Sequence, residues 1–334
     1  MTSLFKKIRH DLYYNHKFIQ YLWLRRDWRK RKQSARKVND REFAISMYKA
    51  RTGKELDLDN PTTFDEKLWY LKLNNRDPLL TICSDKYRVR EYVEKCGLGN
   101  ILNEIYGVWD DARKIDFASL PSPCFLKCNH TSGVNIIYDR DREFDKRDFI
   151  RTFNFMLKQN YYYGSREWNY KNIETRIIAE KVLRDKDGNL PLDYKFMCFN
   201  GVPKVMYLSK NTCKEDGHHT GAGQMLNYYD MEFNLLDISG AGLQNIDEEM
   251  EKPSTWEEMK KYAQMLSDPF PFCRVDFYSI DGKVYFGEIT FYPTGGCQDL
   301  QPEKWERILG GWIDISEVKK FEGEVNHCHG KYNR

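Results

Sequence analysis

The chain has 334 residues, of which 41% are hydrophobic and 31% are charged, with a formal net charge of +3. This balance is typical of a soluble globular protein with a sizeable core, and so small a charge argues against a general nucleic-acid partner. No apolar run is long enough to span a bilayer. The 9 cysteines are scattered without a repeated CxxC spacing, which predicts reduced thiols in a cytoplasmic protein.

Residues 1–37 carry most of the charge asymmetry, because lysines and arginines far outnumber acidic residues there. Between them lie apolar residues at helical spacing, namely Leu4, Phe5, Ile8 and Leu12. A basic amphipathic helix is typical of a segment at an anionic membrane surface. One expectation is therefore peripheral membrane contact through residues 1–37, and the alternative is that these helices pack on the body and bury Trp23 and Trp28.

Helices are predicted over residues 41–75 and 84–96. Thr63 with Glu66 three residues later matches a capping box, and Ser84 is the expected N-cap of the second helix. Lys86, near the start of that helix, is a candidate phosphate contact.

Strands are predicted over residues 104–109, 123–128 and 136–138. Lys127 lies on the second of these strands, directly before a polar loop of Asn129, His130, Thr131, Ser132 and Gly133. Such a loop offers backbone N–H groups to a phosphate. It matches neither the P-loop nor the dinucleotide fingerprint, so an ordinary hairpin is the alternative.

The rest of the chain alternates between strand and turn signals. A helix is predicted over 145–160 and another over 255–268, with Ser254 as its N-cap. The strands predicted in this part are 176–183, 193–199, 205–208 and 225–229. Asn200-Gly201 between two of them is a strong hairpin signal.

Residues 272–296 form the most informative stretch. Two alternating runs flank Asp281-Gly282, a dipeptide that favours a hairpin turn. Period-two alternation places Arg274 with Asp276 on one face, and Glu288 with Thr290 and Phe286 on one face of the second strand. Two neighbouring carboxylates are costly to bury unless a cation joins them. Magnesium is one candidate, and a solvated strand face with an Arg274–Asp276 pair is the other.

In this order, the motifs make the chain resemble the ATP-grasp superfamily, and more closely its TupA-like members from bacterial surface-polysaccharide clusters. The matching segments are SDKYRVREYV (84–93), FLKCNHTSGVNII (125–137), YYYGSREWNYKNIETRIIAEKVL (161–183), DYKFMCFNG (193–201) and PFCRVDFYSIDGKVYFGEITFYPTGG (271–296). The resemblance implies an α+β fold whose two lobes clamp ATP, preceded by a helical N-terminal region. The expected divisions are a basic helical segment (1–59), an ATP-grasp region (60–315) and a tail (316–334).

The resemblance also implies roles for particular residues. Lys86, Lys127 and the loop Asn129, His130, Ser132 and Gly133 would contact the ATP phosphates, and Glu180, Lys181 and Leu183 would form the strand and hinge at the adenine. Lys195 would be a second cation near the phosphates and Arg274 a transition-state stabiliser. Asp276, Glu288 and Thr290 would hold Mg²⁺, although many ATP-grasp proteins have Asn where this chain has Thr290.

The function implied is an ATP- and Mg²⁺-dependent carboxylate–amine ligase with an acyl-phosphate intermediate. Its partners would be a carboxylate-bearing glycan or glycan precursor and an amine donor. A glycosyltransferase is the alternative enzyme, for which Asp139-Arg140-Asp141 offers the outline of a metal-binding DxD motif. A non-catalytic glycan-binding or scaffold protein is the third hypothesis.

Overall fold

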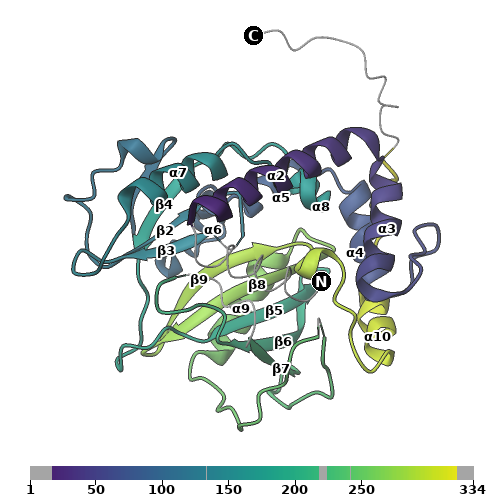
Figure 1. Cartoon of the computed structure of the whole chain (residues 1–334). Coiled ribbons are helices and arrows are strands. Elements are labelled where there is room, and N and C mark those ends of the chain that lie inside the picture. The colour runs from purple at the N-terminus through teal and green to yellow at the C-terminus, as the bar shows by residue number, and fades with distance from the viewer. Residues whose placement is uncertain (1–16, 133, 218–223, 241, 322–334) are drawn as a thin grey trace, which may run out of the picture.

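The computed structural model describes residues 17–132, 134–217, 224–240 and 242–321. Two antiparallel sheets form the centres of two lobes, and in Figure 1 the first sheet lies above the second. The strand order is β1-β4-β2-β3 in the first sheet and β7-β6-β5-β8-β9 in the second. The strands are β1 (Ile105–Trp109), β2 (Cys124–Cys128), β3 (Asn135–Tyr138), β4 (Ile177–Lys181), β5 (Asp193–Phe199), β6 (Val202–Lys210), β7 (Met225–Tyr229), β8 (Phe272–Ile280) and β9 (Lys283–Thr290). The predicted α+β class and strands are confirmed.

The helices lie around the two sheets. They are α2 (Lys17–Lys37), α3 (Asp40–Thr52), α4 (Phe64–Asn74), α5 (Pro78–Ser84), α6 (Val89–Lys95), α7 (Lys146–Met156), α8 (Tyr162–Ser165), α9 (Trp256–Ser267) and α10 (Lys304–Trp312). The capping box of Thr63 and Glu66 is confirmed at the start of α4.

Two predicted N-caps are wrong. Ser84 ends α5, and the Asp85 carboxylate accepts a hydrogen bond from the Tyr87 backbone N–H, so this stretch turns before the next helix begins. Helix α9 follows Thr255, which makes no side-chain cap, so Ser254 lies one position too early.

Each lobe has its own hydrophobic core. In the first lobe, Phe149 and Phe153 of α7 pack against Leu126 and Ile177 of the sheet. In the second lobe, α9 covers β5, β6 and β8, and α4, α5 and α6 contribute to the same core.

The N-terminal helices contact both parts of the molecule. Tyr21 and Trp28 of α2 make edge-on ring contacts with Phe155 of α7, and Tyr48 of α3 packs in a cluster with Trp69 of α4. Residues 17–37 thus pack on the body as the alternative expected, but Trp23 and Trp28 are only partly buried. The apolar face predicted at residues 4–12 lies outside the described residues. No described helix combines the length and the apolar character that crossing a membrane requires.

The hairpin β8–β9 forms as predicted, with positive φ angles of 50° at Asp281 and 75° at Gly282. Asp276 pairs directly with Glu288, and Arg274 pairs with Thr290. A bulge at Gly287 then shifts the register, so Phe286 pairs with Phe277. The prediction that Phe286 shares a face with Glu288 is therefore wrong, because one extra residue reverses the alternation, and Phe286 is buried in the core.

Two buried carboxylates attach α10 to α4. Asp65 accepts hydrogen bonds from the backbone N–H groups of Gln298 and Asp299, and Glu306 accepts from those of Asp65 and Leu300. Burial, opposed by these hydrogen bonds, raises the pKa of Asp65 to about 6 and that of Glu306 to about 8. Both groups therefore bind protons more readily in the folded chain than in the unfolded one.

The raised pKa values of Asp65 and Glu306 predict that the free energy of unfolding falls as the pH rises. Between the ordinary pKa of a glutamic acid, near 4.5, and about 8, the folded state holds a proton that the unfolded state has released, and stability declines in that window. Glu306→Gln removes the titration, so its free energy of unfolding in urea should decline less between pH 5 and pH 8 than that of the wild type. Equal slopes for the two proteins would contradict the assignment, whatever their absolute stabilities.

Candidate functional site

A row of polar side chains crosses four strands of the second sheet. In the sheet register Tyr207 of β6 pairs with Lys195 of β5, Lys195 with Asp276 of β8, and Asp276 with Glu288 of β9. Directly paired residues share a face and lie close together. The Lys195 Nζ is 2.7 Å from an Asp276 carboxylate oxygen and 3.4 Å from one of Asp193.

Arg274 is the centre of this row. Its Nε and one terminal nitrogen donate to the two Asp276 oxygens at 2.6 and 2.7 Å, which is a bidentate pair. The same terminal nitrogen lies 3.0 Å from Glu288 and 3.0 Å from Thr290, and the other donates to the Tyr207 hydroxyl at 2.8 Å. The Thr290 hydroxyl in turn donates to Glu288 at 3.1 Å. One guanidinium thus orients four neighbouring side chains.

The two carboxylates respond differently to these surroundings. Burial raises the pKa of Asp276, and Arg274 and Lys195 oppose that rise. Burial would also raise the pKa of Glu288, but Lys86, Arg274 and Lys195 together hold it well below its usual range. Neighbouring cations therefore favour the ionised form of Glu288, whose side chain is 37% exposed, while Asp276 is enclosed by its cations.

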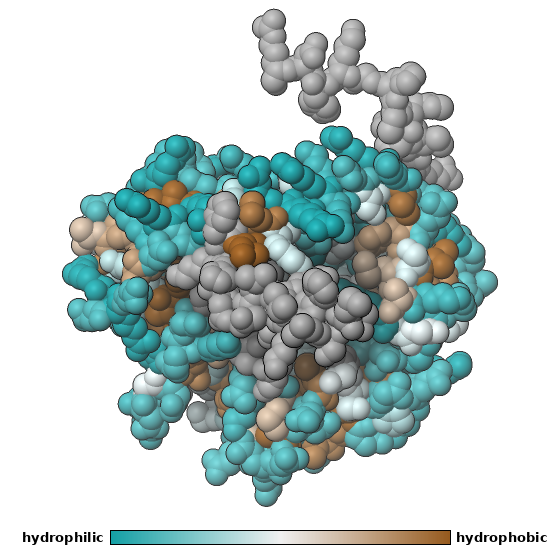
Figure 2. Space-filling view, viewed as in Figure 1, coloured by the Kyte–Doolittle hydropathy of each residue, from teal (hydrophilic) through white to brown (hydrophobic). Residues whose placement is uncertain are grey.

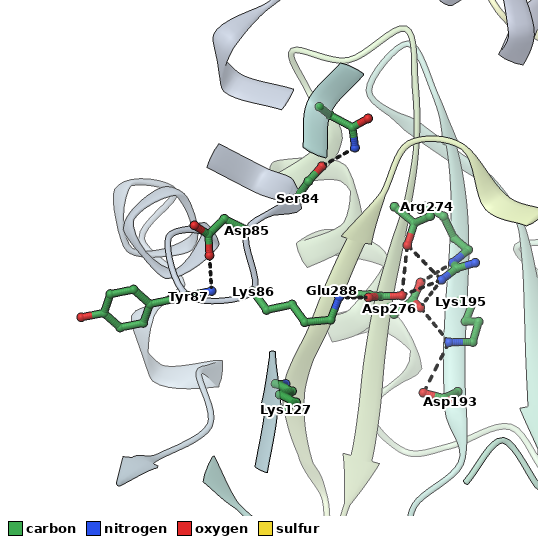
Figure 3. A network of polar contacts seen from close by, with 12 residues as sticks. Ser84, Asp85, Lys86, Tyr87, Lys127, Asp193, Lys195, Arg274, Asp276 and Glu288 are labelled. Atoms are coloured by element: carbon green, nitrogen blue, oxygen red, sulfur yellow. Dashed lines mark hydrogen bonds and ion pairs between the residues drawn. The ribbon is translucent and has the colours of Figure 1, made fainter. Parts of the chain in front are cut away.

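Two lysines approach this row from the rest of the molecule (Figure 3). Lys86, from the turn between α5 and α6, points its Nζ at Glu288 from 3.4 Å. Its backbone N–H donates to the carbonyl of Asn129 in the first lobe. Lys127, on β2, pairs with Glu180 of β4 at 2.7 Å, and both side chains are largely buried. Cations from three strands and one turn, namely Lys127, Lys195, Arg274 and Lys86, thus gather around one space.

That space consists of two adjoining cavities of about 950 and 550 Å³. The larger contains the polar row, and the smaller contains Glu180, Lys181 and Leu183 together with the apolar side chains of Leu192 and Phe286. They share a wall made of Lys86, Phe125, Lys127, Asp193, Thr212, Cys213, Tyr278 and Gly287. The smaller cavity therefore has mixed polar and apolar walls, and it adjoins a larger one that contains the cations Lys195 and Arg274.

The loop after β2 divides into an inward and an outward part. Asn129 is fully buried: its side-chain N–H₂ donates to Asp85 and to the Glu174 carbonyl, and its oxygen accepts from the Arg176 N–H. His130 is also buried, with Nε2 3.0 Å from the Met156 carbonyl, and burial lowers its pKa to about 4. The two side chains therefore make structural hydrogen bonds inside the protein, and the expected phosphate contact of this loop stays a prediction. Thr131 and Ser132 do line the larger cavity.

Most of the remaining residues predicted for the site line one cavity or the other. Lys86 and Lys127 line both, and the larger cavity also takes Lys195, Arg274, Asp276, Glu288 and Thr290. Gly133 lies outside the described residues. Sequence reasoning missed Asp193 and Tyr207; the spacing of Asp193 and Lys195 along one strand was a usable signal for the first, and no motif marks the second.

The oxygen donors suit a magnesium ion in number and kind. Nucleotide sites hold this ion by one or two carboxylates together with phosphate oxygens, and Glu288 with Asp276 supplies two. Glu288 is the accessible one, because both Asp276 oxygens already accept hydrogen bonds from Arg274 or Lys195. The Thr290 hydroxyl is engaged with Glu288 and Arg274. No group of three or more His, Cys, Asp or Glu side chains gathers in the described ranges.

Comparison with known proteins identifies the family. The family model described as TupA-like ATPgrasp matches residues 66–314. The chain belongs to this family. It therefore has the ATP-grasp fold, in which the lobe of sheet β1–β4 and the lobe of sheet β5–β9 face each other across the cavities. No curated protein matches the sequence.

The solved structures that resemble this chain are ATP-grasp ligases with low sequence identity to it. A D-alanine–D-alanine ligase from Bacillus anthracis, complexed with ATP, is 13% identical with a TM-score of 0.40, over 70% of this chain and 67% of that one. An L-amino acid ligase from Bacillus licheniformis is 13% identical with a TM-score of 0.40, over 73% of this chain and 53% of that one. The D-alanine–D-alanine ligase from Helicobacter pylori is 15% identical with a TM-score of 0.39, over 75% and 69%. The fold assignment rests on the family match.

The polar row predicts unequal effects of two substitutions on stability. Arg274→Met leaves buried Asp276 with Lys195 as its cation, and breaking a buried pair in this way costs about 3–5 kcal/mol. Glu288→Gln removes a partly exposed charge and should cost much less. Urea unfolding of both variants measures the difference. Small and equal losses would show that Arg274 is not the centre of the row.

Proposed function

We propose that this protein is an ATP- and Mg²⁺-dependent ligase that joins a carboxylate to an amine on a bacterial surface polysaccharide or its precursor. The observation that carries the proposal is the adjoining pair of cavities: a smaller one with the apolar side chains of Leu183, Leu192 and Phe286 among its walls, and a larger one that contains Lys195 and Arg274, with Lys86 and Lys127 on the wall between them. An adenine suits the first chamber and a triphosphate the second. The glycan part of the proposal comes from the resemblance to TupA-like proteins alone.

The proposed reaction has two steps. A substrate carboxylate oxygen attacks the γ-phosphorus of ATP, the bond to the β-phosphate oxygen breaks, and ADP leaves. The amine then attacks the carbonyl carbon of the acyl phosphate, releasing inorganic phosphate and one proton as the amide forms. Such chemistry asks mainly for positioning and for neutralising charge.

The residues divide these tasks. Lys127 and Lys86 would hold the phosphates, and Lys195 and Arg274 would face the charge that spreads over the transferring group. Glu180, Lys181 and Leu183 would border the adenine. Magnesium, held by Glu288 with Asp276, would neutralise phosphate charge. Thr290 was predicted as a third ligand, and its hydrogen bond to Glu288 supports a role in orienting that carboxylate.

The Asp139-Arg140-Asp141 triplet does not support the glycosyltransferase alternative. Asp139 accepts from the Ser122 hydroxyl and from the Asp141 backbone N–H, and Arg140 donates to the carbonyls of Ala118 and Leu120. None of the three residues of the triplet lines either cavity. The triplet serves as a surface turn.

The test of the proposal is ATP turnover, measured with and without Mg²⁺ against a panel of carboxylates and amines. Turnover that requires both an added carboxylate and Mg²⁺ supports the ligase. Turnover of a nucleotide sugar without ATP would establish the transferase instead, and absence of ATP binding would leave a non-catalytic protein.

Peripheral membrane contact through residues 1–37 also stays a prediction, for a cytoplasmic protein at the inner face of the membrane. The outer side of α2 is hydrophilic and includes the exposed residues Arg26, Arg29 and Lys30 (Figure 2). Salt-sensitive sedimentation of the full-length protein with anionic vesicles would support it. Failure to sediment at low salt would reject it.

Lys127 provides a test of the triphosphate site. Lys127→Ala should weaken ATP binding by about 1.5–3 kcal/mol, the size of a charge-assisted hydrogen bond, in a calorimetric titration. Lys114→Ala removes an exposed lysine that pairs with Asp110 on the surface and is the matched control. Unchanged affinity in the Lys127 variant would remove this residue from the phosphate site.

Glu288 provides a test of the metal assignment. Glu288→Gln should lose most Mg²⁺-dependent turnover, because the amide carries no charge to hold the ion, while ATP still binds. Glu257→Gln, on the exposed side of α9 beside Lys252 and Lys260, should behave as wild type in the same Mg²⁺ titration. Wild-type turnover by the Glu288 variant at saturating Mg²⁺ would exclude this residue as the ligand.

A further inference from the structure

The larger cavity has a second end that the reaction described above does not use. This end is walled by the N-terminal helices, α4, the segment 161–170 and the loop after β9. Its charged lining residues are Arg31 from α2, Arg51 from α3, Lys72 from α4, and Glu167. Three cations thus face one carboxylate, whereas each cation at the other end has a carboxylate partner.

Arg51 and Lys72 converge on one short loop. Arg51 donates to the Thr294 carbonyl at 3.0 Å, and the Lys72 Nζ donates to the Gly295 carbonyl at 2.7 Å. Thr294, Gly295 and Gly296 all have positive φ angles, of 50°, 68° and 76°. This backbone turns two successive carbonyls toward the two cations and fixes both head groups at the cavity wall.

Neither cation is neutralised by these contacts. Among the described residues, no carboxylate lies within ion-pairing distance of Arg51 or Lys72. An ammonium has three donors and a guanidinium five, so donors remain for a ligand. Lys72 is 1% exposed, and its Nζ lies 3.5 Å from the centroid of the Trp69 ring, so a carbonyl and an aromatic face hold this charge without a carboxylate at ion-pairing distance.

Burial shifts the pKa of both Lys72 and Glu167 toward the neutral form. Burial lowers the pKa of Lys72 to about 8 and raises that of Glu167 to about 7. Near neutral pH Lys72 is therefore still mostly protonated, while Glu167 is ionised only in part. Arg31 has its own partner, Asp27, at 2.7 Å.

We propose that Arg51 and Lys72 bind a second anionic group of the acceptor, a carboxylate or a phosphate separate from the carboxylate that is activated. The inference rests on the proposed ligase function, since it assigns the substrate class of that same cavity. Tyr161 and Tyr170, whose ring centroids are 4.9 Å apart, also line the cavity and offer planar walls for the body of a sugar-like acceptor. Arg51 lies outside the family match at residues 66–314 and Lys72 lies inside it, so this site is shared between the N-terminal helices and the ATP-grasp region.

The test uses the full-length protein loaded with Mg²⁺ and a non-hydrolysable ATP analogue, so that the triphosphate site is filled. Three probes are titrated by saturation-transfer NMR: a hexuronate, a hexose phosphate and the uncharged hexose. At least one anion should bind, and more tightly than the uncharged sugar. Whichever anion binds more tightly, the hexuronate or the hexose phosphate, shows whether the site prefers a carboxylate or a phosphate.

Arg51→Gln should weaken anion binding by about tenfold or more, the effect of losing one charge-assisted hydrogen bond. Lys72→Met should give a loss of the same kind. Arg41→Gln is the matched control, because Arg41 lies on the same helix and pairs with Asp59 on the surface. Its binding should equal that of the wild type. Melting curves of all variants confirm that they fold.

Two outcomes would overturn the inference while the ligase proposal stands: the analogue binds but neither anion does, or Arg51→Gln and Lys72→Met bind the anions as the wild type does. If the analogue itself fails to bind, the ligase proposal falls. The same titration without nucleotide then decides the anion site, by comparing Arg51→Gln with Arg41→Gln.

Discussion

The bidentate pair of Arg274 and Asp276 is the interaction on which the rest of the site depends. It is buried, and the same guanidinium reaches Glu288, Thr290 and Tyr207. A buried charge must be paired and hydrogen-bonded to be tolerated, and here one cation meets this need for two carboxylates. The arrangement keeps Asp276 enclosed and leaves Glu288 facing the cavity, so two chemically similar side chains acquire different accessibility.

The hairpin that carries these residues could be predicted from sequence because its signals are local. Asp281-Gly282 marks the turn, and alternation places Asp276 and Glu288 on one face. The bulge at Gly287, directly before Glu288, could not be predicted from this alternation. A Cβ at this position would lie 3.0 Å from the Asp276 carbonyl, so the glycine reflects a close approach of two strands that only the folded hairpin reveals.

Contacts between segments that lie far apart in the sequence could not be predicted from local sequence patterns. Lys195 meets Asp276 across 81 positions of the chain, and a role for this lysine came from the family resemblance alone. Asn129 and His130 were assigned to a phosphate loop because of their polar character. Their side chains satisfy backbone groups of other segments in the interior, and polarity alone does not tell a ligand contact from a buried structural hydrogen bond.

Lys86 joins the two lobes through one residue. Its backbone N–H bonds to the Asn129 carbonyl in the first lobe, and its ammonium pairs with Glu288 in the second. An anion that takes up this ammonium must compete with Glu288 for it, and so frees a carboxylate oxygen of Glu288. Anion binding at Lys86 and the release of Glu288 are then two sides of one equilibrium, and the Lys86–Glu288 pair should be tightest in the empty protein at low ionic strength.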